Sequence, residues 1–105
     1  MSDVVLVLST APAGDDTAER LARALIDERL AACVNVHAPM LSIYRWKGDV
    51  ETDNERQLVI KTTRAALPAL EKRLRELHPY ELPEFIVIAA AGGSAYLGWV
   101  AQEVQ

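Results

Sequence analysis

The first third of the chain shows a change from a continuous apolar run to helical spacing. Residues Val4 to Leu8 are apolar at every position, which is typical of a strand covered on both faces. The segment "APAGDD" then ends this strand. Asp16 followed by Glu19 resembles a capping box at a helix N-terminus. Apolar side chains recur at helical spacing as far as Leu25, so we expect a helix from about 16 to 29.

The middle of the chain alternates with the period of a strand and predicts a long β-hairpin. Apolar and polar residues alternate over 31–46 with an interruption at Pro39, which predicts one long strand or two collinear strands with a bulge at that proline. Turn residues around Gly48 and Asp49 predict the end of the hairpin. The returning strand is expected over Glu55 to Thr62. Its two faces carry Leu58 and Ile60 on one side, and Val59 and Lys61 on the other.

Three further elements are predicted towards the C-terminus. Leucines spaced three and four apart from Leu67 to Leu77 predict a helix, and it should end at His78 because the following Pro79 disfavours a helical conformation there. Phe85 to Ala91 is a second all-apolar strand. Ser94 can begin a short C-terminal helix.

The predicted order is β-α-β-β-α-β with one terminal helix. This order is typical of an α+β ferredoxin-like sandwich, in which both helices cover one face of a four-stranded antiparallel sheet. At 105 residues the chain is long enough for a single domain over 1–105. The second sheet face would stay uncovered although the first and last strands are apolar on both sides, so we expect an oligomer.

Composition narrows the range of functions. The net charge is −4, from 11 basic and 15 acidic residues, and the basic residues are scattered, which disfavours nucleic-acid binding. No apolar run approaches the ~20 residues of a membrane helix, and the start of the chain does not resemble a secretion signal. With a single cysteine in addition, we expect a cytoplasmic protein without a membrane partner. We find no enzyme signature, because nucleophile turns and Gly-rich phosphate loops are absent.

Cys33 and His78 are the candidate metal ligands. Thiolate and imidazole favour copper and zinc, and Glu81 and Glu84 follow His78 closely. Cys33 and His37 would share a strand face but lie ~13 Å apart, so they cannot share an ion directly. Structural interpretations stay open for both candidates: Cys33 as a small buried residue, and His78 as a residue favoured at the end of a helix.

Aromatic residues cluster near the hairpin tip and on the terminal helix. Tyr44 and Trp46 approach the tip, while Tyr96 and Trp99 lie on the last helix. Such side chains are enriched at protein interfaces. An RNA-stacking platform is disfavoured by the acidic balance of the chain. Lys61 is expected to lie against a carboxylate, and Glu55 and Glu84 are the candidates.

Several segments together resemble one family. These are "LAACVN", "SIYRWKGDVE", Glu55 with "LVIKT", "HPYELPE" and "YLGWV", and in this order they are similar to the divalent-cation tolerance protein CutA family over nearly the whole chain. The resemblance implies a ferredoxin-like protomer, related in shape to PII signalling proteins, that assembles as a tight homotrimer. It also implies a role in tolerance of copper and other divalent cations in bacteria.

The resemblance carries expectations for particular residues. Cys33 and His78 match positions proposed to bind copper in bacterial relatives, so we expect weak binding of copper(II) or another divalent ion there. Some relatives have two histidines before the proline and further cysteines, and this chain has neither. Clefts between subunits are expected to be lined by residues within or beside the motifs: Trp46, Glu55, Lys61, Glu84, Tyr96 and Trp99.

Three functions therefore stay open at the level of sequence. The first is a trimeric copper or divalent-cation tolerance protein. The second is a PII-like sensor that binds a small anion or nucleotide between subunits, with Lys61 as its cationic contact. The third is an interaction scaffold without a ligand.

Overall fold

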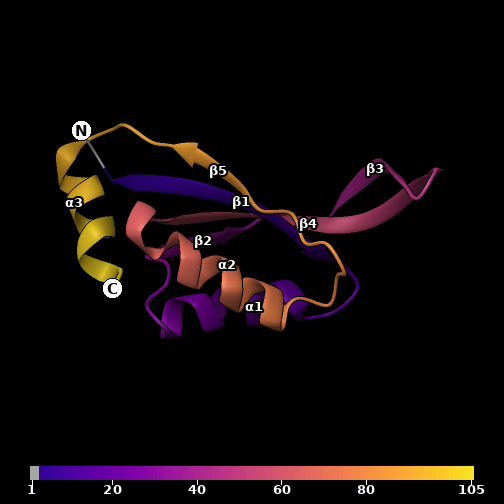
Figure 1. The fold of residues 1–105 in the computed structure, drawn as a ribbon, viewed down its shortest axis with the longest axis horizontal. Coiled ribbons are helices and arrows are strands. Elements are labelled where there is room, and N and C mark those ends of the chain that lie inside the picture. Colours follow the sequence, from indigo (N-terminus) through magenta and orange to yellow (C-terminus); the bar gives the residue numbers. More distant parts are fainter. Residues whose placement is uncertain (1–2) are drawn as a thin grey trace.

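The computed structural model describes residues 3–105 and places two helices on one face of an antiparallel sheet (Figure 1). The strands are β1 (Val4–Pro12), β2 (Cys33–Val36), β3 (Met40–Trp46), β4 (Asp49–Thr63) and β5 (Ile86–Ala89). The helices are α1 (Thr17–Asp27), α2 (Leu67–Leu77) and α3 (Ser94–Glu103), with a 3-10 turn at Arg64–Ala66. The order β2-β4-β1-β5, with β3 extending the hairpin from β4, confirms the ferredoxin-like α+β prediction.

The core lies between the sheet and helices α1 and α2. Val7 of β1 is opposite Ile60 of β4, and both side chains are fully buried against the helices. Leucines at helical spacing close this layer from the other side: Leu21 and Leu25 of α1, and Leu70 and Leu74 of α2. We call the opposite side of the sheet, which α1 and α2 do not cover, the open face.

The strands of the hairpin and β1 are longer than predicted. β4 begins at Asp49 rather than Glu55, and β1 continues to Pro12 rather than ending at Leu8. The polar residues that begin β4 are exposed on both sides, so they show no periodicity. Cross-strand pairing decides these ends, since Trp46 pairs with Asp49 and Pro12 pairs with Glu55. In contrast, β5 is shorter than the predicted Phe85–Ala91 strand.

The prediction of two strands with a bulge at Pro39 is the correct one of the two alternatives. Val36 pairs with Leu58 and Met40 pairs with Glu55, so residues 37–39 lie opposite only 56 and 57 of β4. The extra residue ends β2 and starts β3. At the tip, Lys47 and Gly48 both have positive φ, 51° and 88°, which is typical of the two-residue turns that match the strand twist.

The ends of the helices follow the predicted signals only in part. α2 ends at Leu77, and His78 has the extended conformation that precedes proline. The predicted capping box at Asp16 is wrong, because its side chain does not cap the helix and instead pairs with Arg20. Asp15 takes the capping role: its Oδ1 accepts the amide N–H of Thr17 at 2.9 Å. The acidic residue one position earlier has the geometry to reach the first turn.

Two apolar surfaces are exposed on the single chain. The hairpin presents Leu41, Ile43 and Val50, with 63%, 65% and 62% of their surface exposed. The edge strand β5 exposes Ile86, Val87 and Ile88. The hairpin also extends well beyond the two helices (Figure 1). Within residues 3–105, no helix combines the length and apolar character needed to cross a membrane.

Candidate functional site

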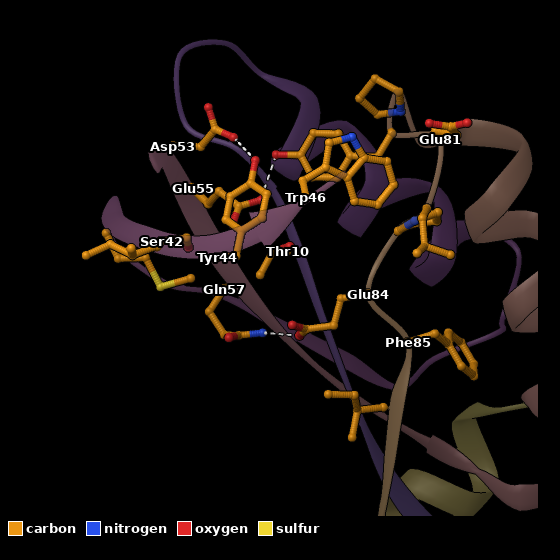
Figure 2. Close-up of a pocket in the computed structure, with 17 residues that line it drawn as sticks. Thr10, Ser42, Tyr44, Trp46, Asp53, Glu55, Gln57, Glu81, Glu84 and Phe85 are labelled. Atoms are coloured by element: carbon orange, nitrogen blue, oxygen red, sulfur yellow. Dashed lines mark hydrogen bonds between the residues drawn. The ribbon is translucent and has the colours of Figure 1, made fainter. Parts of the chain in front are cut away.

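A cavity of about 900 Å³ lies on the open face, between the hairpin and the loop that joins α2 to β5 (Figure 2). We call it the acidic pocket. It is lined by Thr10, Met40, Ser42, Ile43, Tyr44, Trp46, Asp53, Glu55, Gln57, Pro79, Tyr80, Glu81, Leu82, Pro83, Glu84, Phe85 and Ile86. Its wall on β3 and β4 follows from the register. Because Ser42 pairs with Asp53, alternate residues of the two strands share this face.

Each of three carboxylates in the acidic pocket accepts a hydrogen bond from a neutral donor. The hydroxyl of Tyr44 donates to Asp53. The hydroxyl of Tyr80 donates to Oε2 of Glu55 at 2.7 Å. Nε2 of Gln57 on β4 donates to Oε2 of Glu84 at 3.2 Å. Among the described residues, Asp53, Glu55 and Glu84 form no ion pair with lysine, arginine or histidine.

The pKa values of Tyr44 and Tyr80 are both raised in this environment. The hydrogen bond to Asp53 raises the pKa of Tyr44 to about 12, with smaller contributions from burial and from the charges of Asp53, Glu51 and Glu55. Burial raises the pKa of Tyr80 well above its ordinary value, and the hydrogen bond to Glu55 adds to the effect. Removing a proton from either hydroxyl would place two anions in direct contact. Both tyrosines are therefore neutral donors near neutral pH.

At the rim of the pocket, the ammonium group of Lys47 contacts two lining residues. Nζ of Lys47 lies 5.4 Å from the centroid of the Trp46 ring. The same atom lies 3.6 Å from Oε2 of Glu81. A cation is thus held between an aromatic face and a carboxylate, both of which line the cavity.

His78 anchors the loop that forms one wall of the pocket. The side chain is 7% exposed, and Nε2 donates to the carbonyl oxygen of Thr10 at 2.7 Å. Nδ1 accepts the amide N–H of Tyr80 at 3.1 Å. Since a carbonyl can only accept and an amide N–H can only donate, these contacts select one neutral tautomer. Both ring nitrogens are engaged, so a metal ion would have to displace one of these bonds.

Cys33 lies elsewhere on the open face. It is partly exposed and pairs with Lys61 across β2 and β4, whereas the loop anchored by His78 lies beside Thr10, which pairs with Gln57. Lys61 and Gln57 are four residues apart on β4, or ~13 Å. The structure therefore does not bring Cys33 and His78 together. Among residues 3–105, no three His, Cys, Asp or Glu side chains converge as a metal site would require.

The six residues predicted to line a cleft fall into two groups. Trp46, Glu55 and Glu84 line the acidic pocket. The others form what we call the lysine cluster: Nζ of Lys61 is 3.3 Å from the hydroxyl of Tyr96, and the rings of Tyr96 and Trp99 lie 5.5 Å apart. That all six line one cleft between subunits stays a prediction.

The expected carboxylate partner of Lys61 is absent within the described chain. Lys61 makes no ion pair there, and its ammonium lies 5.6 Å from the centroid of the Tyr96 ring instead. Glu55 shares the open face with Lys61, but it is six residues away along the same strand, or ~20 Å. The two charges cannot meet in one copy.

Sequence reasoning missed several residues of the acidic pocket. Tyr80 and Gln57 were not assigned to it, nor was the pairing of Tyr44 with Asp53. Alternation through the hairpin could have placed Tyr44 beside Asp53, had β4 been extended back to Asp49. Nothing local in the sequence indicates that Tyr80 reaches Glu55.

Known proteins match both the sequence and the structure. The family model described as "CutA1 divalent ion tolerance protein" matches residues 5–103. The divalent-cation tolerance protein CutA of Thermus thermophilus is 46% identical over 101 residues, covering 95% of each chain. Human protein CutA is 44% identical over 89 residues, which are 84% of this chain and 50% of the human protein.

Solved structures agree over nearly the full length. The crystal structure of CutA from Xylella fastidiosa has a TM-score of 0.93 and 45% identity, covering 99% of this chain and 100% of that one. The Thermus thermophilus protein has a TM-score of 0.92. The motifs, the strand order and these matches all point to one assignment. The chain belongs to the CutA family of divalent-cation tolerance proteins.

Proposed function

We propose that this chain acts in divalent-cation tolerance as a PII-like homotrimer that binds copper or another divalent ion weakly. The exposed apolar surface of the hairpin and of β5 is the observation that supports a trimer. Exposed apolar strands with open edges invite pairing, and further copies of the chain would cover them in a closed assembly. The single unpaired cysteine is compatible with a reducing compartment such as the cytoplasm.

The trimer would also complete the two groups of cleft residues. Among the described residues, Asp53, Glu55 and Glu84 of the acidic pocket have no cationic partner, and Lys61 of the lysine cluster has no carboxylate partner. The distance along β4 prevents them from meeting in one copy, so we place the acidic pocket of one subunit near the lysine cluster of the next. Charge complementarity of this kind favours a specific arrangement of subunits.

The residues of one subunit do not fit a dedicated metal cage. His78 uses both ring nitrogens in hydrogen bonds, and among residues 3–105 Cys33 belongs to no group of three ligating side chains. Copper(II) or a related ion would therefore be bound weakly as cargo, with the partly exposed thiolate of Cys33 as the more accessible ligand. His78 would first have to break its hydrogen bond with Thr10 or with Tyr80. Binding should weaken as the pH falls, because protons compete with a metal ion for its ligands.

Copper titration tests the metal assignment. We expect weak binding by calorimetry under anaerobic conditions, a clear loss in Cys33→Ser, and a smaller loss in His78→Ala. Ser94→Ala on α3 serves as a control outside the acidic pocket. If both Cys33→Ser and His78→Ala match the wild type in stoichiometry and affinity, neither residue is a ligand.

A PII-like sensor is the second candidate, because the charge of Lys61 is not neutralised by a carboxylate among the described residues. A small anion or nucleotide could bind between Lys61 and Tyr96 at a subunit boundary. A thermal-shift screen separates the two functions, because only ligands that prefer the folded state raise the melting temperature. If the protein is a sensor, nucleotides should raise its melting temperature. If it is a cation-tolerance protein, divalent ions should raise it, and the melting temperature of a scaffold should respond to neither.

A further inference from the structure

We propose that the acidic pocket binds a small organic cation, in which an ammonium or guanidinium group is carried on an apolar body. This proposal concerns a different ligand from the divalent ions discussed above and does not depend on them. It rests on the charge of the lining, on one buried carboxylate and on a cation that the pocket residues already hold.

All charged side chains that line the pocket are negative. It contains Asp53, Glu55, Glu81 and Glu84, whereas no lysine, arginine or histidine is among the lining residues of the described chain. Glu81 at the rim pairs with Lys47, but the other three carboxylates receive hydrogen bonds from neutral groups alone among the described residues. A concave site with this lining concentrates cations and repels anions.

Glu55 is the group that most needs a cation. The residue is only 8% exposed and its carboxylate faces the cavity (Figure 2). Among the described residues it accepts a hydrogen bond from the hydroxyl of Tyr80. A buried carboxylate is costly unless an opposite charge or several donors compensate it. Within the described part of the chain Glu55 forms no ion pair, so a cation from outside the chain would compensate its charge.

Lys47 shows that the pocket residues can hold an ammonium group. Its Nζ lies over the ring of Trp46 and beside the carboxylate of Glu81, in the arrangement by which proteins recognise organic cations. Trp46 faces the cavity together with Tyr44 (Figure 2), and Tyr80 also lines it. The ammonium of Lys47 lies beside the rim residues Trp46 and Glu81, whereas the carboxylates of Glu55 and Asp53 form no ion pair among the described residues.

The geometry favours an extended organic cation over a metal ion. Asp53 and Glu55 are two residues apart on β4, so their backbone positions are separated by ~7 Å, and no three ligating groups converge among residues 3–105. The cavity of about 900 Å³ is within the range of small-molecule sites. Apolar side chains such as Phe85, Leu82 and Ile86 give the body of the ligand a surface to contact.

A neighbouring subunit would not satisfy the pocket by itself. If the next copy in a trimer brings its Lys61 towards the pocket, one positive charge meets the three carboxylates of Asp53, Glu55 and Glu84. Two carboxylates would still lack a cation. The pocket would therefore keep its preference for positively charged ligands in the assembled protein.

A matched pair of probes tests the proposal on the assembled full-length protein. We would titrate 2-phenylethylammonium and its uncharged counterpart 2-phenylethanol, following Trp46 fluorescence in a Trp99→Phe background, where Trp46 is the remaining tryptophan. We expect saturable binding of the amine that weakens with added salt, and at least tenfold weaker binding of the alcohol. Equal affinity for the two compounds would overturn the proposal, because it would make the pocket an apolar site only.

Three substitutions locate the cation. Glu55→Gln keeps an acceptor for Tyr80 but removes the charge, so we expect a loss of amine affinity of about tenfold or more. Glu84→Gln should weaken binding in the same direction and serves if Glu55→Gln does not fold. Lys47→Met removes the internal competitor at the mouth and should strengthen binding several-fold. Glu76→Gln on α2 is the matched control and should leave the affinity unchanged.

Two results would reject the assignment. Unchanged amine affinity in both Glu55→Gln and Glu84→Gln would show that the carboxylates do not hold the cation. Amine binding that occurs in Lys61→Met but not in the wild type would show that a second copy of the chain fills the pocket with its own lysine.

Discussion

Removing apolar side chains from the hairpin should separate the proposed trimer into monomers. Leu41 and Ile43 of β3 are about two-thirds exposed in one chain, and Thr52 and Asn54 of β4 are their cross-strand partners. The double substitution Leu41→Thr with Ile43→Thr keeps residues that favour strands while it removes most of the apolar surface. The fold of each subunit should survive, since neither side chain belongs to the buried core.

The magnitude follows from the exposed fractions. Full burial of a leucine or isoleucine side chain contributes about 1.5–3 kcal/mol, so covering the exposed 63% and 65% contributes about 2–4 kcal/mol per subunit. Over three subunits this is about 6–12 kcal/mol, of which threonine would retain roughly half. A loss of about 3–6 kcal/mol per trimer raises the dissociation constant by a factor of about 100 or more.

Light scattering coupled to gel filtration, over a series of protein concentrations, measures the effect. We expect a trimer mass for the wild type at low micromolar concentration and a monomer mass for the double variant, with unchanged circular dichroism. Ile26→Thr removes a partly exposed isoleucine from α1 instead and should remain a trimer. A double variant that stays trimeric throughout, or a wild type that is monomeric or dimeric, would refute the reasoning.

Three further predictions concern single positions. Asp53→Asn replaces the carboxylate whose hydrogen bond, with a smaller effect of its charge, raises the pKa of Tyr44 to about 12, so the phenolate absorbance should titrate closer to pH 10. Because the folded-state pKa is the higher one, this contact stabilises the protein below about pH 10, and the contribution is lost as pH rises towards 12. Gly48→Ala places a side chain at φ 88° and should lower the free energy of unfolding by about 1 kcal/mol in urea titrations, with no such loss at the control Gly14→Ala, where φ is not positive. Leu70→Ala opens a cavity in the core and should cost about 2–5 kcal/mol in the same assay, and a cost below 1 kcal/mol would contradict its place in the core.

The local pattern of the sequence predicted the elements whose signals lie within a few residues. Helix α2 could be predicted from its leucines and from Pro79, because a helix depends on spacing of three and four and on the residue before a proline. The bulge at Pro39 could be predicted for a similar reason. The start of β4 could not, because its exposed polar residues carry no periodicity and only pairing with β3 makes them a strand.

The sequence by itself determined the order of elements and hence the ferredoxin-like class, and it identified the residue types available for chemistry. Tertiary structure decided which of them meet. Tyr80 reaches Glu55 across 25 residues, Lys61 meets Tyr96 across 35, and His78 meets Thr10 across 68. Such contacts depend on strand register and on the path of the loop, which a one-residue slip would change completely. For this reason the sequence indicated six cleft residues, whereas only the folded chain shows that they form an acidic pocket and a separate lysine cluster.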